Sequence, residues 1–161
     1  MISVILPTRD SAARLVQVLT LLVPAAIDGL VKEVVFADAG STDATLAIAE
    51  DSGARVVQVQ GDAGTRLAAG VATARGGWIL ALGDDLTLPE AWRVPVEAHL
   101  ASGGGKPAWI AEAGLFGLAG RPLAVLASRE AVAAAGGFKP GDEPLKALLE
   151  RLKPKAVRLR V

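Results

Sequence analysis

The chain has 161 residues, of which 52% are hydrophobic and 21% are charged, a balance typical of one globular domain with a sizeable core. Its 17 basic residues are matched by 17 acidic ones, which argues against general nucleic-acid binding. The absence of cysteine excludes disulfides and thiolate metal sites, and it fits a reducing compartment.

Strand-like and helix-like segments alternate along the first hundred residues. Short apolar or β-branched runs predict strands at residues 2–6, 33–37, 55–59 and 79–82. Helical patterns follow them at residues 12–22, 43–51, 65–74 and 89–100. We expect the first helix to stop before Pro24 and the second to be capped by Ser41 or Thr42. This alternation predicts parallel strands with right-handed crossovers, and hence a doubly wound sheet.

The regular alternation ends after the glycine run at residues 103–105. Further strands are predicted at residues 108–113, 123–127 and 156–161, and short helices at 129–135 and 145–152. No linker is long enough to divide the chain. The sequence therefore predicts a single α/β domain.

The end of the strand at residues 79–82 carries a first candidate site. Gly83 is followed by Asp84 and Asp85, which places two carboxylates at the rim of the sheet, where open α/β sheets bind ligands. Adjacent carboxylates repel unless a cation joins them, and their hard oxygens suit Mg²⁺ or Mn²⁺. The pattern indicates a metal–diphosphate site, and a turn with a helix cap is the competing interpretation.

A second candidate site follows the strand at residues 33–37. Asp38 closes this strand, Gly40 permits a tight backbone path, and Asp43 precedes a helix. A carboxylate at position 38 can accept hydrogen bonds from a nucleobase or from ribose hydroxyls. We interpret Asp38 as a ligand contact and Asp43 as a helix cap.

In their order and spacing, these motifs resemble family 2 glycosyltransferases of the GT-A fold. The matching segments are an opening strand (residues 2–8), Asp-x-Gly-Ser-Thr-Asp-x-Thr (38–45), a central stretch with a helix ending in Ala-Arg-Gly (66–77), Gly-Asp-Asp with a later Leu-Pro (83–89), and Gly-Gly-Phe (136–138). The resemblance covers nearly the whole chain. It implies a mostly parallel, Rossmann-like sheet flanked by helices, with a nucleotide-binding half at residues 1–102 and a short acceptor-side half at 103–161.

The resemblance implies that five residues bind the nucleotide part of a donor, and Asp84 is one of them. Pro7, Thr8 and Asp38 would line the pocket for the base and the ribose. Arg66 would contact the diphosphate, since a guanidinium pairs well with phosphate oxygens. A solvated helix arginine is the competing interpretation of Arg66.

The resemblance also implies the metal ligands and the catalytic base. Asp85 would be the direct metal ligand, with Asp84 beside it at the metal and near the ribose. Gly83 stands where the family usually has the first acid of this motif. The family often has Glu-Asp as its base shortly after Gly-Gly-Phe, and the nearest acids here are Asp142 and Glu143.

The implied function is hexosyl transfer, with inversion, from a nucleotide-diphosphate sugar to an unknown glycan or lipid acceptor. A divalent cation, Mg²⁺ or Mn²⁺, would assist, and cell-envelope polysaccharide biosynthesis is the expected context. One alternative is a catalytically inert nucleotide-binding relative. A second is a nucleotidyltransferase, although its Gly-Thr-Arg-Leu signature should follow the first strand and here opens the third helix, at residues 64–67. An interaction module that uses a basic tail ranks last.

Charge is unevenly distributed near the end of the chain. Residues 139–161 contain seven lysines or arginines against three acids. This segment could contact an anionic membrane surface, and a solvated helix and strand is the competing interpretation. The first seven residues lack the basic region of a signal peptide. We therefore expect a cytoplasmic protein, at most peripheral to the inner face of the membrane.

Overall fold

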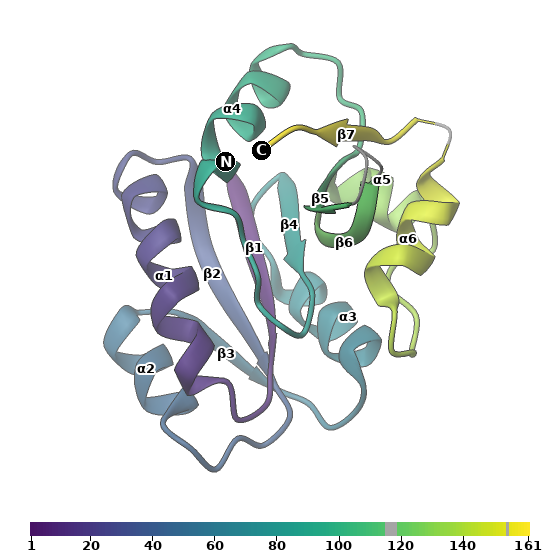
Figure 1. The fold of residues 1–161 in the computed structure, drawn as a ribbon. Coiled ribbons are helices and arrows are strands. Elements are labelled where there is room, and N and C mark those ends of the chain that lie inside the picture. The colour runs from purple at the N-terminus through teal and green to yellow at the C-terminus, as the bar shows by residue number, and fades with distance from the viewer. Residues whose placement is uncertain (115–118, 154) are drawn as a thin grey trace.

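The computed structural model describes residues 1–114, 119–153 and 155–161, and these form a seven-stranded sheet between helices (Figure 1). The strands lie in the order β3-β2-β1-β4-β6-β5-β7. Their bounds are β1 (Ile2–Thr8), β2 (Val31–Asp38), β3 (Arg55–Gln58), β4 (Trp78–Leu82), β5 (Ala108–Ala113), β6 (Ala119–Ser128) and β7 (Val157–Leu159).

The first four strands form the parallel half of the sheet. β1 pairs in parallel with both β2 and β4, and β2 pairs in parallel with β3. β6 runs antiparallel to β4 and β5, while β7 is parallel to β5. All seven residues of β1 are buried, because a central parallel strand is covered on both faces. The predicted α/β domain with a mostly parallel sheet is confirmed.

Helices cover both faces of this sheet. Their bounds are α1 (Ala12–Ile27), α2 (Thr45–Ser52), α3 (Ala63–Thr73), the 3₁₀ turn η1 (Glu90–Trp92), α4 (Arg93–Ala101), α5 (Arg129–Ala134) and α6 (Pro144–Leu152). One apolar cluster joins the sheet to α1, α2 and α4, and a second joins it to α3, α5 and α6. Among the residues with described positions, no helix is both long and apolar enough to cross a membrane.

Helix α1 continues past the point where the sequence predicts its end. It includes Pro24 and reaches Ile27, so the expected stop before the proline is wrong. Proline lacks only one amide donor, and Leu22 and Ala25 on either side of it are fully buried in the core. Packing of this apolar face offsets the lost hydrogen bond, and the backbone amide of Asp28 closes the helix on the Pro24 carbonyl.

The start of α2 also differs from the prediction. The helix begins at Thr45, whose amide donates to Asp43 Oδ1 at 2.9 Å. Ser41 is not the cap, because its hydroxyl donates to Asp38 instead, at 2.5 Å. Thr42 is not the cap either, and its amide donates to Asp10 Oδ1 at 2.7 Å. Asp43 is not the N-cap either, because that position is Ala44, which makes no side-chain cap hydrogen bond. Asp43 lies one residue earlier, and its carboxylate accepts from the first amide of the helix.

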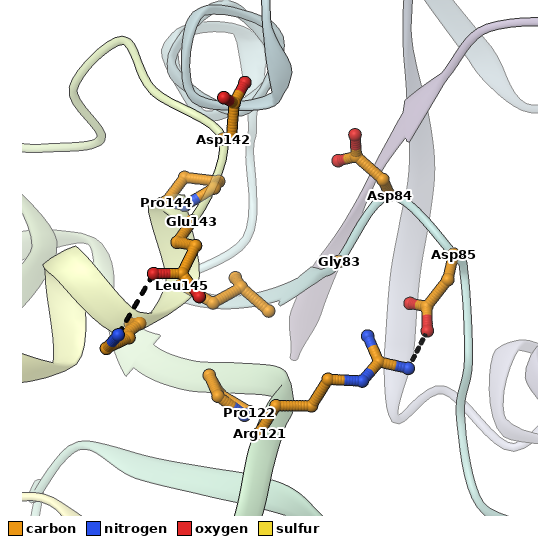
Figure 2. A pocket seen from close by; sticks show the side chains of 10 residues that line it. Gly83, Asp84, Asp85, Arg121, Pro122, Asp142, Glu143, Pro144 and Leu145 are labelled. Carbon is orange, nitrogen blue, oxygen red and sulfur yellow. Dashed lines mark hydrogen bonds and ion pairs between the residues drawn. The ribbon is translucent and has the colours of Figure 1, made fainter.

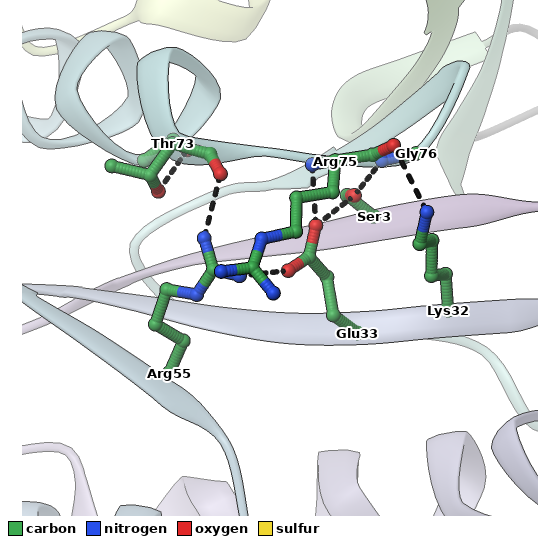
Figure 3. A network of polar contacts seen from close by, with 8 residues as sticks. Ser3, Lys32, Glu33, Arg55, Thr73, Arg75 and Gly76 are labelled. Atoms are coloured by element: carbon green, nitrogen blue, oxygen red, sulfur yellow. Dashed lines mark hydrogen bonds and ion pairs between the residues drawn. The ribbon is translucent and has the colours of Figure 1, made fainter.

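A polar network joins the strands at the end of the sheet where β1, β2 and β3 begin (Figure 3). Glu33 of β2 accepts from Ser3 Oγ at 2.6 Å and from the Arg75 amide at 2.5 Å, and it pairs with Arg55 at 2.9 Å. Burial opposes ionisation of Glu33, but these hydrogen bonds and the arginine charges lower the pKa of its carboxyl. Arg55 also donates to the Thr73 carbonyl at 2.7 Å. The network ties the connection before β4 to three neighbouring strands, away from the candidate site described next.

Candidate functional site

A pocket of about 210 Å³ lies at the carboxyl end of β4 (Figure 2). Three separate parts of the chain line it, namely residues 83–85, 121–122 and 142–146. Antiparallel pairing brings the first two together, since β4 pairs with β6 and the Gly83 amide donates to the Leu123 carbonyl at 3.0 Å. The acids predicted to bind metal and those predicted to act as the base therefore face one cavity.

The turn after β4 holds its residues in a strained conformation. The Leu86 amide donates to the Gly83 carbonyl at 3.0 Å, which closes the turn over the two aspartates. Leu86 has φ 51°, in the left-handed region, which costs about 1–2 kcal/mol for an L residue with a side chain. Its side chain is buried, with 3% exposure, and this packing offsets the strain. Strained backbone of this kind is concentrated at functional sites.

Asp85 is held by hydrogen bonds inside the pocket. Its Oδ2 accepts from Thr87 Oγ1 at 2.9 Å and also pairs with the guanidinium of Arg121. Partial burial opposes ionisation, but the hydrogen bonds from Arg121 and Thr87 prevail and lower the pKa of the Asp85 carboxyl. Asp85 is therefore ionised near neutral pH and carries a full negative charge at the end of β4.

Asp84 is more exposed than Asp85, with 55% of its side chain accessible. Its Oδ2 lies 3.2 Å from Nη2 of Arg66, a side chain in α3 that is only 8% exposed. Desolvation raises the pKa of the Asp84 carboxyl, and the charges of Asp85 and Asp142 add to this, while Arg66 opposes it. Ionised Asp84 thus lies in an environment that additional positive charge would stabilise.

The donor set fits a hard divalent cation that is held partly by its substrate. Within residues 1–114, 119–153 and 155–161, no group of three or more acids or histidines is close enough to form a complete metal cage. Mg²⁺ is commonly bound by one or two carboxylates together with substrate phosphates and waters. Asp84 and Asp85 can supply those carboxylates beside an open pocket, and a diphosphate could complete the coordination.

Asp142 and Glu143 lie on the opposite wall of the pocket, just before α6. Glu143 is paired with Lys146 at 3.0 Å, and 73% of its side chain is exposed. Asp142 is also exposed, and its negative charge influences Asp84 across the pocket. Figure 2 shows the Glu143 carboxylate directed toward its lysine partner rather than toward Asp84. The two acids therefore share a wall but differ in their electrostatic surroundings.

The loop that carries these acids is attached to the start of α3. Asp62 caps that helix by accepting from the Thr65 amide at 2.8 Å, and its other oxygen accepts from the Gly141 amide at 2.8 Å. The Gly64 amide donates to the Gly141 carbonyl at 3.2 Å. A Cβ at Gly64 would lie 1.9 Å from the Lys139 carbonyl oxygen. Position 64 therefore requires glycine, because the two backbones approach closely there. This contact explains the glycine that begins the Gly-Thr-Arg-Leu segment.

Gly64→Ala is expected to lower the free energy of unfolding by about 1–3 kcal/mol, because the methyl group would force the 139–141 backbone away from α3. Urea denaturation measures this loss, and amide hydrogen exchange at Gly141 should become faster as its bond to Asp62 is broken. Gly77→Ala is the control, since a Cβ at Gly77 meets nothing within 4 Å. Equal stability and exchange in both variants would contradict this account of the loop.

The residues predicted to line the base and ribose pocket lie at the carboxyl ends of β1 and β2. Thr8 is fully buried, and its Oγ1 donates to Asp38 Oδ1 at 2.8 Å. Asp38 Oδ2 accepts from the amides of Gly40 and Ser41, at 2.9 and 2.8 Å. Burial opposes ionisation of Asp38, but the hydrogen bonds lower the pKa of its carboxyl. Asp38 therefore shapes this loop, and its predicted contact with a nucleotide remains a prediction, as does that of Pro7.

Sequence reasoning missed two residues of this region. Arg121 pairs with Asp85, and Asp62 holds the loop before Asp142. No local pattern indicates either residue, because Arg121 lies 36 positions from its partner and Asp62 lies 79 positions from Gly141. A weak signal for Asp62 exists in its place directly before a helix, where aspartate is a preferred cap.

Comparison with known proteins agrees with this arrangement of strands. The profile of the family described as glycosyl transferase family 2 matches residues 3–103. No curated protein sequence gives a significant match.

Solved structures of glycosyltransferases match almost the entire chain. Glucosyl-3-phosphoglycerate synthase from Mycobacterium tuberculosis, in complex with uridine diphosphate (UDP), superposes with a TM-score of 0.72 and 25% identity, over 100% of this chain and 71% of that one. The same enzyme with Mn²⁺, UDP and phosphoglyceric acid gives a TM-score of 0.73 and 26% identity, over 98% and 67%. S. aureus TarS, residues 1–349, gives a TM-score of 0.76 at 19% identity, over 98% and 57%, and supports the fold alone.

Proposed function

The chain belongs to glycosyl transferase family 2 and is a glycosyltransferase, and we propose that its donor is a uridine-diphosphate sugar bound with Mn²⁺ or Mg²⁺. The observation that carries this proposal is the pocket in which Asp84 and Asp85 face Asp142 and Glu143. We further propose that residues 1–102 hold the donor and residues 103–161 contribute the acceptor side. The similar mycobacterial enzyme, which was crystallised with UDP and Mn²⁺, supports the choice of nucleotide and cation.

On the donor side, the proposed ligands neutralise a diphosphate. Asp85 and Asp84 would hold the cation, which acts as a Lewis acid for the phosphate oxygens when it is bound. Arg66 contributes a nearly buried positive charge next to Asp84 and can bind a phosphate oxygen directly. Its low exposure and its pair with Asp84 favour this contact over a purely solvated helix arginine. Pro7, Thr8 and Asp38 would line the pocket for the base and ribose, and since Thr8 and Asp38 are fully buried, direct contact requires the loop that follows β2 to move.

On the acceptor side, a carboxylate must accept the proton of the attacking hydroxyl. We propose Asp142 for this role, with Glu143 second, because Lys146 already neutralises Glu143. Attack from the face opposite the departing diphosphate would invert the anomeric carbon. The acceptor would be a glycan or a lipid. The basic segment at residues 139–161 would allow contact with anionic lipid at the inner face of the membrane, as envelope polysaccharide synthesis would require.

Asp142→Asn is expected to reduce sugar transfer or donor hydrolysis by about 10²–10⁴-fold, because it removes the proposed base. Affinity for UDP and Mn²⁺ should remain, since Asp142 is not among the proposed metal ligands. Glu143→Gln is the matched comparison and should retain most of the turnover. Full turnover by the Asp142 variant would remove it as the base, and full turnover by both variants would remove both residues.

Calorimetric titration tests the proposed function itself. UDP, GDP and their sugars would each be added with and without Mn²⁺, and tight binding of the UDP series only with the cation is expected. Binding of these nucleotides without any cation, or no binding of them at all, would contradict the proposal. Cation-dependent binding without any turnover would instead identify a catalytically inert relative.

A further inference from the structure

Arg121 bridges two carboxylates at the edge of the donor pocket. It belongs to β6, and its guanidinium pairs with Asp85 through Nη2 and with Glu112 through Nε, the latter at 3.1 Å (Figure 2 shows the pair with Asp85). More than half of the Arg121 side chain is exposed (54%), so it can move without disturbing the core. An exposed positive charge thus lies on the acid proposed to bind a metal.

The contact engages one of the two carboxylate oxygens of Asp85. Oδ2 accepts both from Arg121 and from Thr87 Oγ1. Oδ1 accepts from the Thr87 amide at 3.4 Å and lies beside Gly83, which also lines the pocket. A cation that binds either oxygen of this carboxylate from the pocket therefore lies next to the positive charge of Arg121.

We propose that the Arg121 guanidinium neutralises Asp85 in place of a metal ion and must leave this carboxylate before a divalent metal can bind. This inference rests on the proposed function, because it assigns Asp85 as a metal ligand. Without metal, the arginine charge offsets the repulsion between Asp84 and Asp85. On metal binding, Arg121 gives up Asp85 and keeps its ion pair with Glu112, so the displaced charge is not left unpaired.

Competition of this kind makes metal binding depend on the donor. The metal alone must displace Arg121 and obtains only carboxylate oxygens in return. A metal that arrives with a diphosphate also obtains phosphate oxygens, which more than compensate for the lost ion pair. Arg121 thereby suppresses binding of free metal and favours entry of the metal together with the nucleotide.

The direct test measures the affinity for MnCl₂ in the absence of nucleotide. The electron paramagnetic resonance signal of free Mn²⁺ reports how much of the metal is bound. Arg121→Gln is expected to bind Mn²⁺ about three- to tenfold more tightly than the wild type, the size expected from removing an exposed competing ion pair. Arg93→Gln is the matched control, because Arg93 also bridges two carboxylates, Asp28 and Glu97, and none of these three residues lines the pocket. It should leave the affinity unchanged.

A double-mutant cycle shows whether the effect acts through Asp85. In an Asp85→Asn background, Arg121→Gln should no longer change Mn²⁺ affinity, because there is no carboxylate left to compete for. Circular dichroism would verify that each variant is folded. An effect of equal size in both backgrounds would contradict the competition.

Titration of the wild type with Mn²⁺ and UDP together separates the two proposals. One outcome would overturn only the role of Arg121. In it, the wild type binds Mn²⁺ together with UDP, but without nucleotide Arg121→Gln binds Mn²⁺ no more tightly than the wild type does. The same holds if neither protein binds free Mn²⁺ at millimolar concentration. Absence of Mn²⁺ binding by the wild type even with UDP would overturn the proposed function and this inference together.

Discussion

Asp85→Asn is expected to reduce sugar transfer, and affinity for UDP in the presence of Mn²⁺, by about 100-fold or more. Loss of a proposed first ligand should cost at least as much as loss of residues that merely orient ligands, which is typically 10–100-fold. Asparagine has nearly the same shape as aspartate and can still accept from Thr87, so the fold should persist. Calorimetry and a donor-hydrolysis assay would measure the two quantities.

The control for Asp85→Asn is Asp51→Asn, which makes the same charge change on an exposed residue of α2. It should affect neither quantity. UDP affinity of the wild type without Mn²⁺ provides a second reference, because the Asp85 variant should approach it. If Mn²⁺ raised the UDP affinity of the variant as much as that of the wild type, Asp85 would not be a metal ligand. The acidic pair would then be interpreted as part of an ordinary turn.

Asp38→Ala is expected to lower the free energy of unfolding by about 3 kcal/mol. The fully buried carboxylate accepts from Thr8 Oγ1, from the Gly40 amide, and from both the amide and the hydroxyl of Ser41. Its removal leaves these donors without a partner, and each buried unpaired donor costs about 1–3 kcal/mol, less where water can reach it. Urea denaturation followed by tryptophan fluorescence would measure the change.

Asp43→Ala is the comparison for this loop, since Asp43 is exposed, accepts from the amides of Thr45 and Ala12, and its loss should have a smaller effect. Thr8→Val should also cost less, because it removes a single bond to Asp38. Equal losses in all three variants would mean that Asp38 does not organise the loop.

The lowered pKa of Asp38 also predicts how stability depends on pH. Because the folded-state pKa lies below that of the unfolded chain, the ionised carboxylate contributes stability that is fully present above the unfolded value of about 3.9. That contribution is lost as the pH falls through the lowered folded value. The difference in unfolding free energy between wild type and Asp38→Asn should therefore be constant from pH 7 to about pH 5 and should narrow below about pH 4. A difference that widened in acid would contradict the assignment.

Much of the fold could be predicted because its signals are local. The continuous apolar runs of β1 and β4 predict strands buried on both faces of the sheet, and successive side chains of a strand point to opposite faces, so the structure has Leu80 in one core cluster and Ile79 in the other. The error at Pro24 arose from the same local reasoning. A proline removes one hydrogen bond, whereas the burial of Leu22 and Ala25 that outweighs it depends on the sheet beneath.

The sequence by itself determined the element order, the mostly parallel sheet and the acidic pair at the end of a strand, because periodicity and strand-end chemistry depend on neighbours in the chain. Only the tertiary structure decided which groups meet there. Antiparallel pairing of β6 with β4 brings Arg121 to Asp85, and a glycine contact with the Lys139 carbonyl seats the loop that carries Asp142. Ion pairs and close backbone contacts depend on distance in space. Folding into a sheet brings together residues that are far apart in the sequence, and their positions in the chain do not indicate that they will meet.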